Sequence, residues 1–169
     1  GPSIIITGNS AANNECVFKP DTLLDRGIWD LAAARSYTIH PVVVNQLTAR
    51  GSNAPLRGDP NGVHITGAEI EIRDVAGGAL DFGVELPNPF SVPGSGFIPS
   101  TGTTSMNVAV TSIEAIPAAY RNSGVLFSDQ TIVLSVRLFG ETDGRVDVDS
   151  AEFLWPVDIC ETNLMASPP

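Results

Sequence analysis

Thr131–Cys160 reads TIVLSVRLFGETDGRVDVDSAEFLWPVDIC. In its first half, large apolar side chains alternate with smaller or polar ones, which is the period of two of a half-buried strand. The segment GETDG, residues 140–144, is rich in turn-forming residues and lies between two such runs. The sequence therefore predicts a long β-hairpin with its turn at residues 140–144.

Two segments of the chain change the phase of their alternation. In residues 62–74 the apolar side chains stand at odd positions before Gly67 and at even positions after it. In the second strand of the predicted hairpin, the apolar positions change from even to odd near Ser150. A change of phase moves side chains to the opposite face of a sheet, and at a glycine it is typical of a β-bulge. We therefore expect strands that bend at these two places.

Many short runs of this kind, separated by turns, fill the rest of the chain, with Leu80–Leu86 among them. Gly (16) and Pro (13) are frequent, as expected when many turns connect short strands. The sequence contains about eight or nine such runs. Their number and spacing predict an all-β fold, an antiparallel two-sheet β-sandwich of the Ig-like or Greek-key type. An antiparallel barrel is the alternative. The length of 169 residues suits one domain, with its core at residues 16–160 and a tail at 161–169.

The N-terminal segment, residues 1–15, predicts a strand followed by a linker. Ile4, Ile5 and Ile6 form a short β-branched run that favours a strand. Residues 8–15, GNSAANNE, have the composition of a flexible linker. A terminal strand of this kind either joins the sheet of its own domain or adds to the sheet edge of another copy, as in donor-strand assembly.

The net charge of −10 excludes several classes of partner. Lys19 is the only lysine, and the sequence has no cluster of Lys and Arg that could displace the counterions of a nucleic acid. An acidic surface is repelled by anionic membrane surfaces. No run of about 18 apolar residues is present that could span a bilayer. We therefore expect neither nucleic-acid binding nor a membrane span.

Cys16 and Cys160 are the two cysteines, and they stand far apart in the sequence. In a strand-rich chain such a pair favours an exported protein with one disulfide. In the chain-entropy model, closing a loop of this length contributes about 4–5 kcal/mol at most. The alternative is a cytosolic protein with two buried thiols. The dipeptide Gly1-Pro2 is compatible with a protease scar from recombinant expression, which would mean that an upstream export signal was removed.

Residues 87–102, PNPFSVPGSGFIPSTG, predict a long loop because they are rich in proline and glycine. The segment also carries four large apolar side chains, Phe90, Val92, Phe97 and Ile98. Exposed apolar residues on a loop at the end of a sandwich form a recognition surface, so these four are the candidate binding residues. The alternative is a loop that folds back to cap the core, with Phe90 and Phe97 buried.

Asp143, Asp147 and Asp149 are weak candidates for metal ligands. Carboxylates that converge at a hairpin tip could hold Ca²⁺, which takes several oxygen ligands. Their spacing does not match an EF-hand loop, and a solvated strand face is the alternative. His40 and His64, the only histidines, could begin a zinc or copper site, but a closed zinc site needs four ligands and the pattern supplies no others. We therefore expect no bound metal.

The sequence carries no catalytic signature. It lacks the Gly-x-Ser-x-Gly elbow of a serine hydrolase and the glycine loops that bind nucleotides. The two cysteines have the pattern of structural rather than activated thiols. Carboxylate pairs of the glycosidase kind are set in space rather than in sequence, so they stay an alternative. The sequence predicts a protein that is not an enzyme and has no cofactor.

Four blocks of sequence carry a resemblance: GIWDL, YTIHPVVVNQL, VHITGAEIEI and GRVDVDSAEFLWPVDIC. Together they resemble uncharacterised exported or lipoprotein-type surface domains of gliding and predatory bacteria, over roughly Cys16–Cys160. The resemblance implies a β-sandwich of the cell envelope or the extracellular space, and it carries over no catalytic or ligand residues. In a lipoprotein the acylated cysteine is the mature N-terminus, whereas Cys16 follows a strand in this sequence.

These observations together favour an interaction protein outside the cytoplasm. We expect a non-enzymatic structural role at the cell surface, such as adhesion or a fibre subunit. Its partner would be a protein or a glycan, or copies of itself assembled through Ile4–Ile6. A carbohydrate-dependent or Ca²⁺-dependent binding module is the alternative.

Overall fold

The computed structural model describes residues 4–12, 18–24, 26–46, 62–100, 108–110 and 112–161, of which 7–12, 18–24 and 108–110 are described by their backbone alone. Within these residues the fold is all-β, as predicted, with one short helix. The elements are β1 (Ile4–Ala12), β2 (Phe18–Leu24), β3 (Gly27–Asp30), β4 (Tyr37–Asn45), β5 (Val63–Arg73), β6 (Phe90–Ile98), β7 (Val108–Val110), β8 (Ser112–Ile116), α1 (Ala118–Arg121), β9 (Thr131–Thr142), β10 (Asp147–Asp149) and β11 (Phe153–Cys160).

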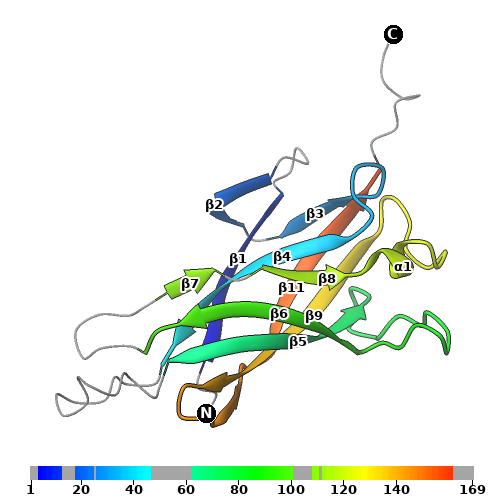
Figure 1. The fold of residues 1–169 in the computed structure, drawn as a ribbon. Helices are drawn as coiled ribbons and strands as arrows, with labels where there is room; N and C mark the ends of the chain where they lie inside the picture. The colour runs from blue at the N-terminus through cyan, green and yellow to red at the C-terminus, as the bar shows by residue number, and fades with distance from the viewer. Residues whose placement is uncertain are drawn as a thin grey trace, which may run out of the picture.

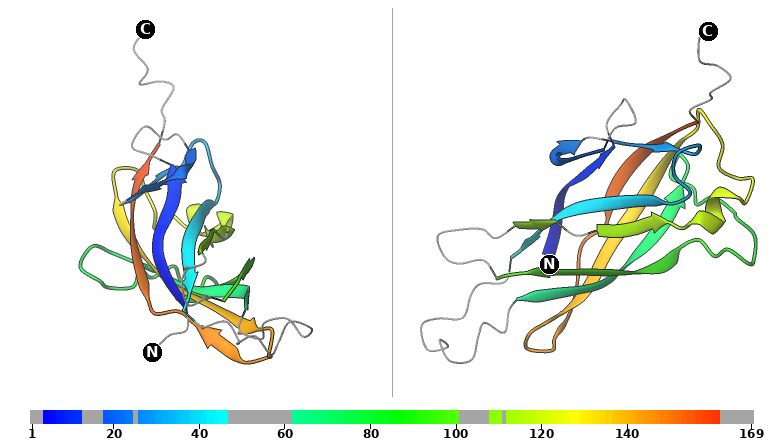
Figure 2. Two further views of the ribbon diagram at one scale, coloured as in Figure 1. Left: turned by 90° about the vertical axis from the view of Figure 1, so that its left-hand side faces the viewer. Right: turned by 45° about the horizontal axis from the view of Figure 1, so that its top comes forward.

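The strands form one continuous curled sheet (Figure 1). The order along the sheet is β2-β1-β4-β8-β6-β5-β9-β11-β3, with β7 beside β4 and β10 beside β9. All of these pairs are antiparallel except β11–β3, which is parallel. A parallel bridge between Ile4 and Ser150 joins the start of β1 to the segment after β10. The sheet therefore curls like half of a barrel, with β1 lying between β4 and β11 in the left view of Figure 2.

The prediction of two separate facing sheets is wrong. β8 connects what would be the two layers, because it pairs with β4 on one side and with Gly94–Ser95 of β6 on the other. The buried amide of Asn45 adds a second link, since its Nδ2 donates a hydrogen bond to the Ile98 carbonyl 3.1 Å away. Alternating side chains dictate which face of a strand is buried, but they do not dictate which strands are neighbours.

The core lies inside the curl, and β9 contributes its centre. Ile132, Leu134, Val136 and Leu138 are all 0% exposed, which confirms the alternation predicted for this strand. On β4, residues 42–44 are buried on both faces. The interior is therefore mainly apolar, with a few buried polar side chains such as those of Asn45 and Thr142.

Both predicted phase changes are present. The register of β5 shifts between Ile65 and Gly67 against both of its neighbours, which confirms the bulge. At Ser150 the second strand of the hairpin divides into β10 and β11, and both pair with β9. The backbone N–H of Leu138 donates to Ser150 Oγ at 2.9 Å, and the N–H of Ser150 donates to the Leu138 carbonyl at 2.8 Å. A side-chain bond therefore replaces a ladder bond where the strand divides.

The hairpin turn lies two residues later than predicted. β9 continues through Gly140 to Thr142, and the turn closes when the N–H of Thr142 donates to the Val146 carbonyl at 2.9 Å. Arg145 has a positive φ of 64°, a conformation that costs a side-chain-bearing residue some energy. Gly140 belongs to the strand, and a methyl group there would lie 3.1 Å from the Ile65 Cα of β5.

Three other segments differ from the predictions. The predicted loop at residues 87–102 contains a nine-residue strand, β6. The predicted strand Leu80–Leu86 is not a strand, because the Asn88 side chain occupies the edge of β5 there: its Oδ1 accepts from the N–H of Ile72 and its Nδ2 donates to the Ile72 carbonyl. At the N-terminus, β1 extends to Ala12, so residues 8–12 of the predicted linker belong to the sheet.

A charged cluster ties the outer face of β5 to the start of β11. The guanidinium of Arg73 bonds to the carboxylates of Glu71 and Glu152, and Ser135 Oγ donates to Glu152 at 2.8 Å. The bonds from Arg73 and then from Ser135 lower the pKa of Glu152 below its ordinary value of 4.5. The carboxylate form of Glu152 is therefore favoured in the folded state.

We predict that this cluster contributes stability only while Glu152 is ionised. Because the folded-state pKa is lowered, the contribution is fully present above about pH 4.5 and is lost as the pH falls through the lowered pKa. Glu152→Gln should therefore reduce the free energy of unfolding at pH 7 by less than about 1 kcal/mol, since the pair is partly exposed. The difference from the wild type should vanish in acid.

Urea denaturation between pH 2 and pH 7 measures this difference. Glu85→Gln, at an exposed position elsewhere, is the matched control and should show no such pH-dependent difference. If the Glu152→Gln difference is the same at all pH values, the ion pair is not its source.

Candidate binding site

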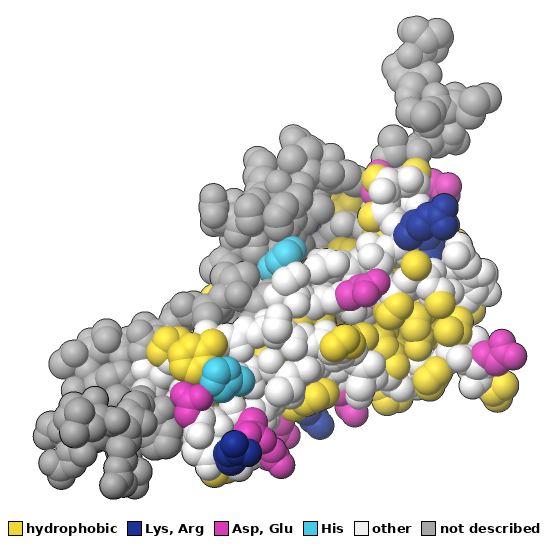
Figure 3. All heavy atoms as spheres, in the orientation of Figure 1, with side chains coloured by type: hydrophobic (Ala, Val, Ile, Leu, Met, Phe, Trp, Pro, Cys, Tyr) yellow, Lys and Arg dark blue, Asp and Glu magenta, His cyan; other side chains and the backbone are white. Residues whose placement is uncertain are grey.

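The outer face of the sheet carries a group of exposed side chains at the end nearest the β9–β10 turn. Cross-strand register brings them together: His64 of β5 lies opposite Phe97 of β6 and Glu141 of β9. On the next strand, Asp147 lies opposite Glu141 and Asp149 opposite Phe139. We call this group, Phe97, His64, Phe139, Glu141, Asp147 and Asp149, the hairpin face. Figure 3 shows a hydrophobic group beside a histidine and acidic side chains at the lower left of the described surface.

Each of the two aromatic rings of the hairpin face packs over a glycine. A methyl group at Gly67 would lie 2.8 Å from the Phe139 ring, and one at Gly62 would lie 2.6 Å from the Phe97 ring. Even so, Phe139 remains 36% exposed and Phe97 45% exposed. The rings are therefore held in position by the backbone beneath them while part of each ring faces solvent.

His64 connects the Phe97 ring to the hairpin turn. Its ring lies 4.6 Å from the Phe97 ring, centre to centre, and its Nε2 lies 2.6 Å from Asp143 Oδ1. The backbone of Asp143 is fixed as well, since its N–H donates to the Gly62 carbonyl at 2.9 Å. These contacts hold the turn against the end of β5.

An open cleft of about 580 Å³ lies beside Phe139. It is lined by Thr66 and by residues 139–141 and 147–149, so its floor is the β9–β10 ladder and its acidic groups are Glu141, Asp147 and Asp149. Thr66 Oγ1 donates to the Phe139 carbonyl at 3.4 Å. The cleft combines an apolar ring with carboxylates, which gives it both contact area and hydrogen-bond acceptors.

The four predicted binding residues do not act as a group. Phe97 belongs to the hairpin face, but Val92 and Ile98 are buried at 7% and 0% exposure, and Phe90 stacks on Tyr120 with 4.5 Å between ring centres. The physical reason is that the segment is a strand, so alternate side chains point into the core. Of the two rings that the alternative buries, Phe90 is half-buried and Phe97 is exposed.

The predicted metal candidates are adjacent in the fold, but they do not form a cluster. Asp143 bonds to His64, while Asp147 and Asp149 project from β10 in register with β9. Among the described residues, no group of three or more His, Cys, Asp or Glu side chains is arranged to hold a metal ion. His40 lies on β4, three strands away from His64, so the two histidines are not neighbours. Burial lowers the pKa of His40.

The predicted assembly strand lies in the sheet of its own chain. Ile4, Ile5 and Ile6 pair with Asn45, Val44 and Val43 of β4. Ile4 and Ile6 are buried at 0% and 8% exposure. Of the two possibilities that the sequence left open, the strand joins the sheet of its own domain. Assembly by strand addition stays a prediction and would require this strand to leave its place.

The predicted disulfide involves a residue outside the described part of the chain, Cys16. Its partner, Cys160, is the last residue of β11, lies opposite Asp30 of β3, and is half-buried. Its backbone carbonyl accepts a hydrogen bond from the N–H of Leu31 at 2.8 Å. The disulfide therefore stays a prediction.

The sequence reasoning missed Phe139 and Glu141 as site residues. Both stand at odd positions of β9, whose even positions are the buried ones. An aromatic residue at an outward position of a predicted strand was the available signal, because such a ring has no place in the core. The pairing of β9 with β5 and β10, which completes the face, was not visible in the sequence.

Comparison of the chain with protein-family models gave no match, and comparison with curated proteins gave none. Within the part of the chain that the structure describes, none of the helical segments has the length and hydropathy needed to cross a membrane.

Proposed function

We propose that the chain is a non-enzymatic interaction module that binds its partner through the hairpin face. The observation that carries the proposal is the pair of exposed rings, Phe97 and Phe139, each packed over a glycine. Aromatic anchors of this kind dominate the energetics of protein interfaces. Because the rings are already ordered, a partner would lose little entropy on binding them.

The polar groups of the face support a role in binding rather than in catalysis. His64 has a carboxylate partner in Asp143, but among the described residues no serine, threonine or cysteine bonds to its ring. A nucleophile within hydrogen-bond reach of its base is the geometry that acyl transfer needs. The carboxylates on the face are exposed, whereas catalytic acids depend on environments that change their pKa.

We also propose that the protein works outside the cytoplasm, at the cell surface or in the cell envelope. Three features support this location: the acidic composition with a single lysine, the strand-rich fold, and the two cysteines. In this setting the partner would be a protein or a glycan of the envelope. Since β1 completes its own sheet, we assign recognition to the hairpin face rather than to the N-terminal strand.

Binding of the labelled full chain to the envelope fraction of the organism that produces it tests the function. We expect saturable binding to the wild type and at least about tenfold weaker binding to Phe97→Ala, since loss of an aromatic anchor costs about 1.4 kcal/mol or more. The ring is partly exposed, so the variant should keep the wild-type melting temperature to within a few degrees.

Phe127→Ala is the matched control, because Phe127 is 59% exposed and lies outside the hairpin face. It should bind as tightly as the wild type. Equal binding by all three proteins, or binding that never saturates, would refute the proposed role of the face.

The predicted disulfide is tested by counting thiols in the denatured chain purified from the producing organism. We expect no free thiol before reduction and two after it, since the sequence has two cysteines. Two free thiols in the unreduced protein would contradict both the bond and the location that it supports.

A further inference from the structure

Like charges stand directly opposite one another on the hairpin face. Glu141 and Asp147 are cross-strand partners in the β9–β10 ladder, and Asp149 lies two residues further along the same face. Directly opposed like charges destabilise an antiparallel pair. A positively charged group of a binding partner would therefore reduce the repulsion between these carboxylates.

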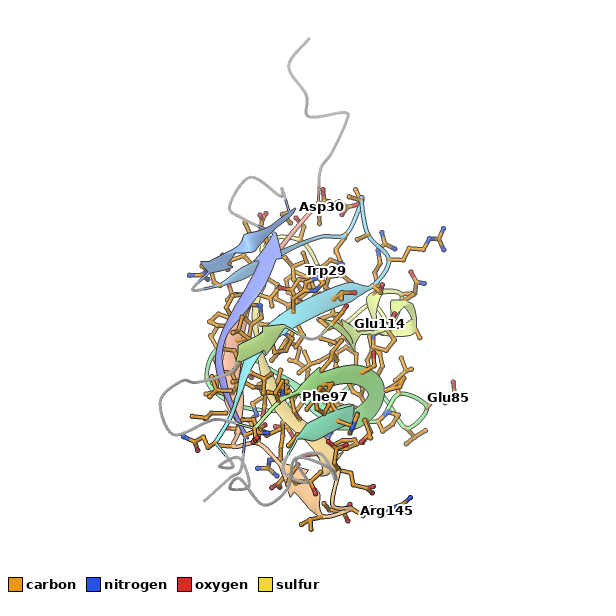
Figure 4. The ribbon with its side chains drawn as sticks, turned by 60° about the vertical axis from the view of Figure 1, so that its left-hand side comes forward. Trp29, Asp30, Glu85, Phe97, Glu114 and Arg145 are labelled. Carbon is orange, nitrogen blue, oxygen red and sulfur yellow. The ribbon has the colours of Figure 1, made fainter. Side chains whose placement is uncertain are left out.

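The described part of the chain supplies these three carboxylates with no counter-charge. Among the described residues, the side chains of Glu141, Asp147 and Asp149 take part in no hydrogen bond or ion pair. Two arginines border the face: Arg137 lies opposite Glu69 of β5, and Arg145 lies in the turn, at the lower edge of Figure 4. Neither is paired with the three carboxylates in the described residues.

The aromatic rings restrict what kind of cation would fit. A guanidinium is planar and weakly hydrated, so it stacks on a ring while its N–H groups bond to a carboxylate. Phe139 is the cross-strand partner of Asp149, and both residues line the cleft, which places a stacking surface and an acceptor at one site. A lysine ammonium makes a point contact and is more strongly hydrated, so it would gain less from the ring.

We propose that the occupant of the hairpin face is an extended segment of a partner protein that carries arginine at alternate positions. This inference rests on the proposed function and names the class of partner. Alternate side chains of an extended segment point the same way about 7 Å apart. Neighbouring strands are about 4.8 Å apart, so two such arginines span the distance between the carboxylates of β10 and the Phe139 ring on β9.

The charge of the hairpin face favours an arginine-bearing segment over a second copy of the chain or a neutral glycan. A second copy of the chain carries a net charge of −10, so it would be repelled. A neutral glycan would stack on the rings but would leave the opposed carboxylates of Glu141 and Asp147 without a counter-charge. Because the face is exposed, the attraction is screened by salt and binding weakens as ionic strength rises.

The test uses the full chain and a seven-residue peptide of alternating glycine and arginine. Amide chemical shifts followed by NMR during titration should change at residues 139–141 and 147–149. The same peptide with lysine should bind more weakly, and one with glutamine should not bind. Raising the salt concentration from 50 mM to 500 mM should weaken binding by the arginine peptide about tenfold or more.

Asp147→Asn combined with Asp149→Asn should weaken binding of the arginine peptide about tenfold. Both positions are exposed, so the double variant should stay folded. Glu85→Gln combined with Glu114→Gln is the matched control: it removes the same amount of charge from exposed positions outside the face, which are labelled with Phe97 in Figure 4. The control variant should bind the peptide like the wild type.

Three results would overturn the inference. Equal weakening by the two double variants would mean that the peptide responds only to the overall charge. Shifts at the same amides with neutral maltohexaose but not with the arginine peptide would identify a glycan site. Shifts that depend on protein concentration alone would identify a second copy. If Phe97→Ala still weakens envelope binding about tenfold or more in any of these cases, the proposed function stands and only the class of partner is wrong.

Discussion

The close approach of β9 to β5 at Gly140 is the constraint on which the rest of the structure depends. A methyl group there would collide with the His64 carbonyl and lie 3.1 Å from the Ile65 Cα. β9 pairs with β5 along one edge and with β11 and β10 along the other. Its inward side chains fill the centre of the curl. If β9 could not lie this close to β5, both the sheet and its core would lose their central pairing.

The same close approach builds the hairpin face. The bulge at residues 65–67 brings Gly67 opposite Phe139, and the absence of a side chain at Gly67 lets the Phe139 ring lie over the backbone. One pairing therefore buries the even residues of β9 and presents the odd ones, Phe139 and Glu141, to solvent. The position of the candidate site is a consequence of the register of the fold.

The alternation of apolar and polar residues predicted much of this structure. It failed where the structure of a segment depends on which strand pairs with it. The buried face of β9 and the bulge at Gly67 both follow from residues close in sequence. β6 was predicted as a loop because of its prolines and glycines. It forms because Pro93 lies opposite Gly67, at the shift of register, where a residue without an N–H is tolerated. Pro41 similarly lies in β4 between the residues that pair with β8 and the residues that pair with β7.

The arrangement of the sheet and half of the candidate site depended on contacts between distant residues. Whether the strands form two layers or one curled sheet depends on β8 and on the parallel pair β11–β3, and such pairings leave no period in the sequence. Phe97 was identified as a site residue because it is apolar in a polar segment. The other ring, Phe139, needed the register between β5, β9 and β10 before it could be assigned to the same face.

Replacement of Gly140 by alanine tests this account most directly, with the free energy of unfolding measured by urea denaturation. Because the new methyl group would meet backbone atoms of β5, we expect Gly140→Ala to lose about 3 kcal/mol or more. Gly78→Ala is the control: its methyl group would meet only the Asp74 carboxylate, at 3.2 Å, and it should stay within about 1 kcal/mol of the wild type. Equal stability of the two variants would contradict the central place of the β9–β5 approach.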